Sequence, residues 1–207
     1  IPDCVMLDWN IGVFTWTPTE DQGPGIYIFD VIVSDDGGLS DSETITVTVG
    51  EVNLAPILDA IGDKIIDEGT ELSFTAAATD GDLPTNTLTF ALTGSVPAGA
   101  TIDSVTGDFT WVPSENQGPE IYVFEVTVTD DGSGLLSDSE TITVAVGEVN
   151  LAPILSPIGN RAVPEEALLA FSAIATDADL PSNALTFSLD AGAPAGASIT
   201  ADGHFSW

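Results

Sequence analysis

Two short acidic stretches have the residue types and spacing of a metal-binding loop. Residues 78–86 read ATDGDLPTN and residues 175–183 read ATDADLPSN, so each places two aspartates two positions apart and an asparagine four positions further on. At a strand end, side chains at i and i+2 project to the same side, so both carboxylates can face one ion. Calcium accepts carboxylate, amide and carbonyl oxygens, whereas zinc and copper favour His and Cys ligands. The pattern predicts a calcium site, and the alternative is an Asp- and Asn-rich turn that binds no metal.

The overall charge of the chain also favours cations as ligands. The 207 residues include 33 Asp and Glu but 2 Lys and Arg, which gives a formal charge of −31. Such a chain repels nucleic acid and anionic membranes, so neither is expected as a partner. Hydrophobic residues make up 43%, which favours a folded chain. No apolar run reaches the roughly 18–20 residues of a membrane span, so membrane insertion is not expected.

An internal repeat organises the chain. EVNLAPIL at 51–58 recurs unchanged at 148–155, which is 97 residues later. FTWTPTEDQGPGIYIFDVIVSDDG at 14–37 matches FTWVPSENQGPEIYVFEVTVTDDG at 109–132. The repeat divides the chain into three parts, called the first, middle and third repeats below: the C-terminal part of one repeat at 1–50, a complete repeat at 51–147, and the N-terminal part of another at 148–207. The opening IPDC, without a signal peptide, suggests a piece of a longer protein.

Within the middle repeat, apolar residues alternate with polar ones, which is typical of strands with one buried face. ELSFTAAATD at 71–80, LTFALTG at 88–94 and IYVFEVTVTD at 121–130 all alternate, and clusters of Gly, Pro, Asp and Asn separate them. About seven short strands in about 97 residues, with no helical pattern, predict an all-β fold of antiparallel β-sandwiches.

Aromatic residues recur at fixed positions of the repeat. Trp16, Trp111 and Trp207 share one position in the motif F-[TS]-W, and we expect them in the core. Tyr27 and Tyr122 stand near the start of a late strand, which suggests a tyrosine corner.

The chain offers few groups for catalysis, so we expect a non-enzymatic protein. His204 is the one histidine, and its repeat counterpart is an aspartate, which favours a solvated turn residue. Cys4 is the one cysteine, which excludes an intrachain disulfide and leaves an apolar filler or an interchain link. Lys64 and Arg161 are isolated and expected at the surface. Composition leaves carboxylate pairs for glycoside hydrolysis open, but a short repeated module without a concave insertion predicts no cleft.

Further acidic residues recur around the two loops. Glu68 and its counterpart Glu165 precede a strand, and Glu20 and Glu115 precede the tyrosine strand, which ends in Asp130 in the middle repeat. Each junction between repeats reads EVNLAP. ATDGDLPTN resembles the ATDxDxGxN segment of cadherin repeats, and EVNLAP resembles a shortened form of their DxNDNxP linker. The pattern W-x-P-x-E-N-Q-G-P-x-x-Y is similar to the cadherin-like and Ig-like repeats of bacterial surface proteins and of the dystroglycan type.

This resemblance covers the whole chain and implies tandem cadherin-like or Ig-like domains with calcium between them. For the first junction it implies these ligands: Glu20, Glu51, Asn53, Asp80, Asp82, Asn86 and Asp130. For the second it implies Glu68, Glu115, Glu148, Asn150, Asp177, Asp179 and Asn183. The linker departs from the cadherin pattern, because Leu54 and Leu151 replace its central Asp-Asn pair. Pro18 and Pro113 replace the aspartate of the upstream D-x-E motif, so we expect one or two ions per junction.

The resulting functional hypothesis is a segment of an extracellular tandem array at the cell surface, a stalk or adhesin, stiffened by calcium at its junctions. Its partners would be the neighbouring repeats and a cell-surface ligand. One alternative is a self-assembling filament or surface-layer subunit, in which homotypic contacts between neighbouring chains complete the partial repeats at 1–50 and 148–207. Another is a glycan- or protein-binding module that uses Trp9, whose repeat counterpart is Ser104.

Overall fold

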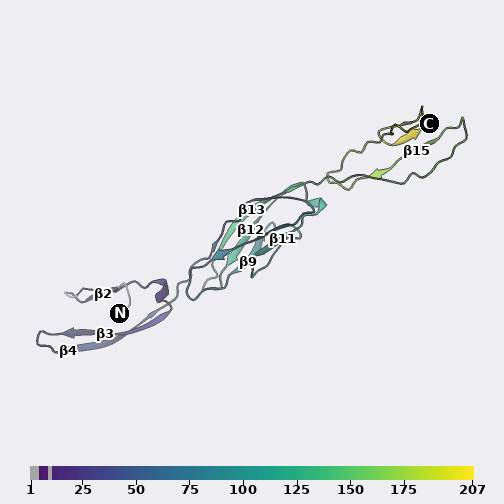
Figure 1. Ribbon diagram of the computed structural model, residues 1–207. Helices are drawn as coiled ribbons and strands as arrows, with labels where there is room; N and C mark the ends of the chain where they lie inside the picture. Colours follow the sequence, from purple (N-terminus) through teal and green to yellow (C-terminus); the bar gives the residue numbers. More distant parts are fainter. Residues whose placement is uncertain (1–4, 9–10) are drawn as a thin grey trace.

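The computed structural model describes residues 5–8 and 11–207. The three repeats lie end to end along one long axis, with the first repeat at one end of the molecule and the third at the other (Figure 1). The predictions about Cys4 and Trp9 lie outside the described residues. Among those that are described, no helix has the length and apolarity needed to cross a membrane.

The middle repeat is a β-sandwich, as predicted. Its strands are β5 (Ile57–Leu58), β6 (Lys64–Asp67), β7 (Leu72–Thr75), β8 (Ala78–Thr79), β9 (Thr89–Gly94), β10 (Thr101–Ile102), β11 (Asp108–Trp111), β12 (Glu120–Thr129) and β13 (Ser137–Gly147). One sheet has the order β6-β13-β12-β9, a second has the order β10-β11-β7, and β5 pairs with β8. Short pairings of two residues bring the strand number above the seven expected. The contact between β13 and β6 is parallel, which the prediction of a purely antiparallel sandwich missed.

The core of the middle repeat consists of the inward residues of the two sheets. Phe109, Phe124, Val126 and Ile142 are almost completely buried, and the rings of Phe109 and Phe124 stack with centroids 5.8 Å apart. Full burial of one such side chain contributes about 1.5–3 kcal/mol. The alternating pattern in the sequence therefore identified the buried face of β12 and β13.

The first and third repeats contain parts of the same sandwich. The first repeat has β1 (Val5–Asp8), β2 (Val13–Trp16), the short 3-10 helix η1 (Glu20–Gln22), β3 (Gly25–Ser34) and β4 (Ser40–Val49). The third has β14 (Ile154–Leu155), β15 (Ala170–Ser172), β16 (Ala175–Thr176), β17 (Ser198–Ile199) and β18 (His204–Ser206). The middle repeat carries the counterpart of η1, which is η2 (Glu115–Gln117).

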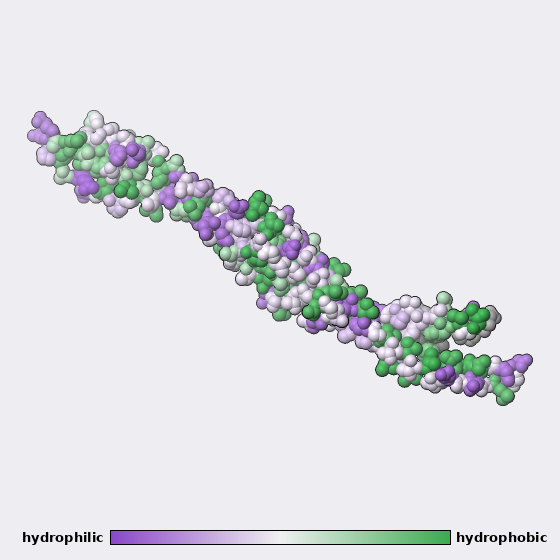
Figure 2. Space-filling view, turned by 180° about the vertical axis from the view of Figure 1, so that it is seen from behind, coloured by the Kyte–Doolittle hydropathy of each residue, from purple (hydrophilic) through white to green (hydrophobic). Residues whose placement is uncertain are grey.

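The hairpin of β3 and β4 exposes residues that are buried in the middle repeat. Val31 is 51% exposed, whereas its counterpart Val126 is fully buried. Val33 is likewise 68% exposed, whereas its counterpart Val128 is buried. The arms of the first repeat, at the right of Figure 2, carry much of the hydrophobic surface in that view. The other strands of a sandwich are needed to cover this face.

Tyrosine and tryptophan side chains fix the turns that lead into β3 and β12. The Tyr27 hydroxyl donates to the backbone oxygen of Gln22 at 2.8 Å, and the Tyr122 hydroxyl donates to that of Gln117 at 3.0 Å. These contacts confirm the predicted tyrosine corners. Trp111 packs edge-on against Tyr122 and is buried, as expected.

Trp207, at the same repeat position, differs from the core expectation. It is 49% exposed, because residues 148–207 contain no counterparts of β12 and β13 to cover it.

Lys64 and Arg161 occupy the same position of the repeat, and each lies over a phenylalanine ring. The Lys64 ammonium donates to the backbone oxygens of Ile61 and Gly62 and lies 5.6 Å from the centre of the Phe74 ring. Arg161 lies 5.8 Å from the ring centre of Phe171. Lys64 is therefore half-buried rather than a free surface residue.

Candidate metal centres at the two joints

Each joint combines three elements, and short-range contacts hold them in place. The first is a turn, η1 or η2, that presents Glu20 or Glu115. In each turn a glutamine carboxamide accepts the backbone N–H three residues earlier, at 3.0 Å: Gln22 from Thr19 and Gln117 from Ser114. The second element is the EVNLAP linker, and the third is the downstream D-x-D loop.

In the first joint, hydrogen bonds fasten the linker to the downstream loop. The Leu54 N–H donates to both carboxylate oxygens of Asp82, at 3.0 and 3.2 Å. The Asn86 amide donates to Asn53 Oδ1 at 2.8 Å and to Asp82 Oδ2 at 2.6 Å. The Asn53 amide donates in turn to Asp130 Oδ2 at 2.8 Å. The asparagines and aspartates predicted from the sequence thus form one network.

The second joint repeats this arrangement at the same positions. The Leu151 N–H donates to both oxygens of Asp179, at 2.9 and 3.2 Å. The Asn183 amide donates to Asn150 Oδ1 at 2.8 Å and to Asp179 Oδ2 at 2.6 Å. Asp177 Oδ1 accepts the N–H of Asp179, as Asp80 Oδ1 does from Asp82.

One hydrogen bond from each upstream turn reaches the downstream loop directly. Glu20 Oε1 accepts the N–H of Leu83 at 3.0 Å, and Glu115 Oε1 accepts the N–H of Leu180 at 2.7 Å. These bonds place a glutamate of one repeat beside the aspartates of the next.

Three carboxylates converge at each linker. In the first joint, oxygens of Glu20, Glu51 and Asp82 lie within 4.8 Å of one another. In the second, oxygens of Glu68, Glu115 and Glu148 do so. Such spacing is repulsive without a cation or proton between the groups.

The second cluster contains carboxylate oxygens without any hydrogen-bond partner. Glu68 is 6% exposed, and its Oε2 is buried and unpartnered. Both side-chain oxygens of Glu148 are also buried and accept no N–H or O–H group, and the Glu148 carboxylate faces that of Glu68. Among the described residues, neither Lys64 nor Arg161 forms an ion pair with these groups. A buried charge is costly unless it is paired or coordinates a metal.

The pKa values follow from this crowding. Burial raises the pKa of Glu148, and the charges of Glu68, Glu115 and Asp179 raise it further. In the first joint, partial desolvation and the neighbouring Glu20 carboxylate raise the pKa of Glu51, although this residue is exposed. Both shifts mean that the negative charge is disfavoured where the glutamates meet.

The residues of the second cluster fit a calcium ion. They supply several hard carboxylate oxygens, no His or Cys, and an orphaned buried oxygen on Glu68. In the first joint, the buried oxygen without a partner is Oδ2 of Asp80, in the downstream loop and not among the three clustered carboxylates. Asp130 differs, because its oxygens accept the N–H groups of Gly132 and Leu136 as well as the Asn53 amide.

Gly118 is part of the second site and was not among the sequence-predicted residues. A Cβ at this position would lie 2.3 Å from Glu68 Oε2 and 3.2 Å from the backbone oxygen of Gly147. The recurrence of Gln-Gly-Pro after both turns was the available signal, but its partner is distant in sequence.

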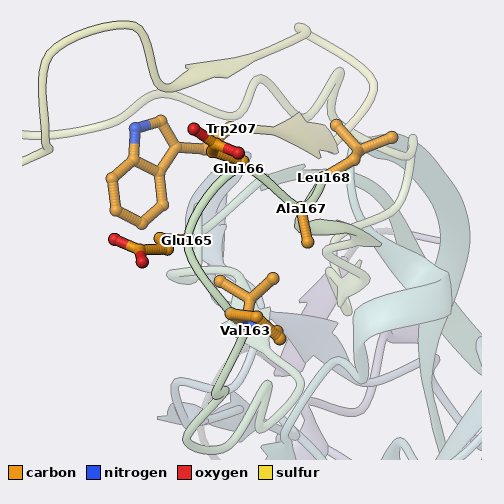
Figure 3. Close-up of a pocket in the computed structure, with 7 residues that line it drawn as sticks. Val163, Glu165, Glu166, Ala167, Leu168 and Trp207 are labelled. Atoms are coloured by element: carbon orange, nitrogen blue, oxygen red, sulfur yellow. The ribbon is translucent and has the colours of Figure 1, made fainter.

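The third repeat has a pocket at the position of the Glu68 loop. It is lined by Val163, Pro164, Glu165, Glu166, Ala167, Leu168 and Trp207, most of them labelled in Figure 3. The corresponding pocket beside Glu68 is also lined by Glu115 and by the linker residues Val149 and Leu151. A joint therefore adds a linker and the glutamate of an upstream turn to this loop, whereas the third-repeat pocket is lined by the loop itself and Trp207.

Comparisons with known proteins agree with this architecture. A family model described as Putative Ig domain matches residues 55–147. Protocadherin-like wing polarity protein stan of Drosophila melanogaster is 30% identical over 171 residues, which are 75% of this chain and 5% of that protein. Lacto-N-biosidase of Bifidobacterium longum is 31% identical over 156 residues, which are 70% of this chain and 10% of that protein. The chain thus spans a tenth or less of the length of these relatives.

Solved structures of cadherin extracellular domains have the same fold. Human CDH23 EC21-23 is 22% identical with a TM-score of 0.59, and the match covers 99% of this chain and 71% of that one. Mouse Cadherin-23 EC22-24 is 20% identical with a TM-score of 0.55 over the same shares. The chain therefore has a cadherin-like, Ig-like fold, and its middle repeat matches the Putative Ig domain family.

Proposed function

We propose that this chain is a non-enzymatic segment of an extracellular tandem array, a stalk or adhesin, whose joints are stiffened by calcium. The three parts 1–50, 51–147 and 148–207 would be successive domain units, each a structural partner of the next. The similarity to cadherin extracellular domains supports a structural or adhesive role outside the cell. The cadherin-like fold is typically non-enzymatic, which supports the absence of catalysis.

One observation carries the calcium proposal: the buried, unpartnered Oε2 of Glu68 in a cluster with Glu115 and Glu148. The carboxylate groups of the second joint come from the upstream repeat and the linker, and Asp179 of the downstream repeat lies close enough to raise the pKa of Glu148. A calcium ion held by these residues would neutralise repulsion at the hinge and tie the two repeats together. In the first joint, Glu20, Glu51, Asp80 and Asp82 would hold the ion.

The expected affinity makes the joints responsive to the surrounding calcium. Extracellular modules bind calcium with Kd values of roughly 10⁻⁴–10⁻³ M. Binding to the folded state stabilises by about 2.7 kcal/mol when the ligand is at a hundredfold excess over Kd. Near-millimolar calcium gives less than this, so the joints would stiffen reversibly.

Calcium titration of the whole chain by calorimetry, with melting curves in parallel, tests the proposal. We expect saturable binding and a Tm that rises with calcium but not with the same concentration of magnesium, which dehydrates reluctantly and demands octahedral geometry. A Tm that is identical in chelator and in millimolar calcium, without binding heat, would refute the calcium site.

The exposed hairpin of the first repeat favours a second candidate, a self-assembling filament or surface-layer subunit. Val31 and Val33 are 51% and 68% exposed, whereas their counterparts Val126 and Val128 are buried. Strands β14–β18 of a neighbouring copy could cover this face and repeat the contact head to tail. Sedimentation of the 207-residue chain over a range of concentrations tests this candidate, because a filament subunit grows into long species and an array segment stays monomeric.

A further inference from the structure

We infer that the linker of each joint is fastened to the downstream repeat without metal, that one cation serves each joint, and that the metal-free molecule bends between the upstream repeat and the linker. This inference rests on the proposed calcium site and adds its stoichiometry and the position of its hinge. The latch of the first joint is defined as Asn53, Leu54, Asp82, Asn86 and Asp130. The latch of the second joint is Asn150, Leu151, Asp179 and Asn183.

The side-chain amide N–H groups and both carboxylates of the first latch have protein partners. The backbone N–H of Leu54 and the amides of Asn53 and Asn86 all donate within the latch, at 2.6–3.2 Å. Asp82 is 2% exposed, and both of its carboxylate oxygens accept hydrogen bonds from the Leu54 N–H. The linker is therefore held by hydrogen bonds that need no ion.

The downstream end of the first latch leaves no place for a second cation. Asp130 is 3% exposed, and three donors already occupy its oxygens: the N–H groups of Gly132 and Leu136 and the amide of Asn53. Gly132 packs so closely that a Cβ would lie 1.5 Å from Asn53 Oδ1. An ion there would have to break the bond between Asn53 and Asp130 and displace the linker.

In the first joint the unpartnered oxygen is Oδ2 of Asp80, outside the latch, and in the second joint the unpartnered oxygens lie in the glutamate cluster. At the second joint, these are Oε2 of Glu68 and both oxygens of Glu148, just before the latch begins at Asn150. The upstream turn reaches the downstream loop through Glu115, which accepts the N–H of Leu180. Without an ion, repulsion between the glutamates opposes this contact. The N–H of Val149 is bonded to Glu68 of the upstream repeat and that of Leu151 to Asp179 of the downstream repeat, so the hinge falls around Asn150.

Asp82 belongs both to the latch and to the carboxylate cluster of the first joint. It belongs to the latch through Leu54 and Asn86, and its carboxylate also lies within 4.8 Å of Glu20 and Glu51. A single cation between these carboxylates would join the upstream turn to a linker that is already fixed downstream. This arrangement makes one ion sufficient for each joint.

The test uses the full 207-residue chain, in calcium and in chelator. Calorimetric titration should give one calcium ion per joint, and amide hydrogen exchange by NMR should show that the N–H groups of Leu54 and Leu151 stay protected after chelation. Two or more ions per joint, or loss of this protection in chelator, would overturn the inference while leaving calcium binding intact. A complete absence of calcium binding would overturn the proposed function and the ion count together, and the latch would then be judged by the exchange data alone.

Two variants separate the latch from the ion site. Asn183→Ala should speed exchange of the Leu151 N–H by roughly tenfold in chelator, because it removes two hydrogen bonds of the latch. Glu148→Gln should weaken calcium binding and leave that protection unchanged. Asn160→Ala, at an exposed asparagine outside both joints, is the control and should change neither. If Glu148→Gln instead removes the Leu151 protection, the latch depends on the ion site and the inference is wrong.

Discussion

At the scale of single residues, Glu68 determines the properties of the second joint. Its carboxylate is buried among Glu115 and Glu148, and one of its oxygens has no partner. Its Oε1 accepts the N–H of Val149 at 3.2 Å, so the side chain is also oriented by the linker. A carboxylate buried to this extent destabilises the fold when it has no partner and stabilises it when a cation is paired with it.

Glu68→Gln should therefore have opposite effects with and without calcium. We expect calcium affinity at the second joint to fall roughly tenfold or more, since affinity follows the number of charged ligands. The metal-free variant should be more stable than the metal-free parent, because a repulsive charge is removed. Calorimetric titration and melting in chelator measure both effects, with Glu71→Gln, at an exposed position, as the control. Unchanged affinity would remove Glu68 from the site.

Gly118→Ala tests the packing that lets Glu68 enter the joint. The added methyl group would lie 2.3 Å from Glu68 Oε2, so the carboxylate must move. We expect weaker calcium binding at the second joint, measured by titration. Gly50→Ala is the matched control, because a Cβ there has no atom within 4 Å. Equal affinity in both variants would show that the position of Glu68 does not matter.

At the scale of elements, equivalent strands of two repeats differ in how much of their surface other strands cover. Val31 of β3 and Val126 of β12 occupy the same repeat position and differ in exposure, 51% against 0%. Val126→Ala should destabilise the middle repeat by about 2–3 kcal/mol through the cavity it leaves. Val31→Ala should change stability by less than about 0.5 kcal/mol. Calorimetry of both variants compares them, and a large loss for Val31→Ala would mean that this face is covered in solution.

The turn before β11 gives a prediction about pH. Hydrogen bonds from the N–H groups of Thr106 and Val105 lower the pKa of Asp103. Because the folded pKa is below the unfolded one, this group stabilises the fold above its unfolded pKa of about 3.9. That contribution is lost as the pH falls through the folded pKa. Chemical denaturation at pH values from about 6 to about 2.5, a range that brackets the ordinary aspartate pKa, should show the parent losing stability faster than Asp103→Asn. Parallel curves of stability against pH would contradict the assignment.

Alternating apolar residues were sufficient to predict the strands and the buried face, because that pattern is local. The repeat of 97 residues likewise placed the acidic loops beside the linkers. Contacts between distant positions were not predictable. Asp138 and Glu140, in the recurrent SDSETITV, accept the N–H groups of Leu58, Ile61 and Gly62, which are about 80 positions away. Their sequence reads as an ordinary polar strand edge.

The site shows the same division between local and distant information. The resemblance to cadherin repeats, carried by residue types and spacing, assigned acidic and amide groups to each joint as expected metal ligands. It did not separate the hydrogen-bonded latch from the glutamate cluster, because this depends on which oxygens find donors in three dimensions. Asn53 and Asp130 illustrate this, since they bond to each other across 77 positions.

At the scale of the whole molecule, repulsion between carboxylates opposes the contacts that hold the repeats in line. A formal charge of −31 lies on a chain of repeats in line, joined by two linkers where further carboxylates meet (Figure 1). Without cations, repulsion at the joints opposes the contact between the upstream turn and the downstream loop. Bound calcium would make the line of repeats the preferred shape.

Small-angle X-ray scattering of the 207-residue chain, in calcium and in chelator at equal ionic strength, tests the central claim most directly. If calcium stiffens the joints, the maximum dimension is longer in millimolar calcium, and the distribution of distances shows repeats held in line. In chelator the molecule bends at its joints and the maximum dimension shortens. Superimposable scattering profiles in the two conditions would contradict calcium-dependent stiffening.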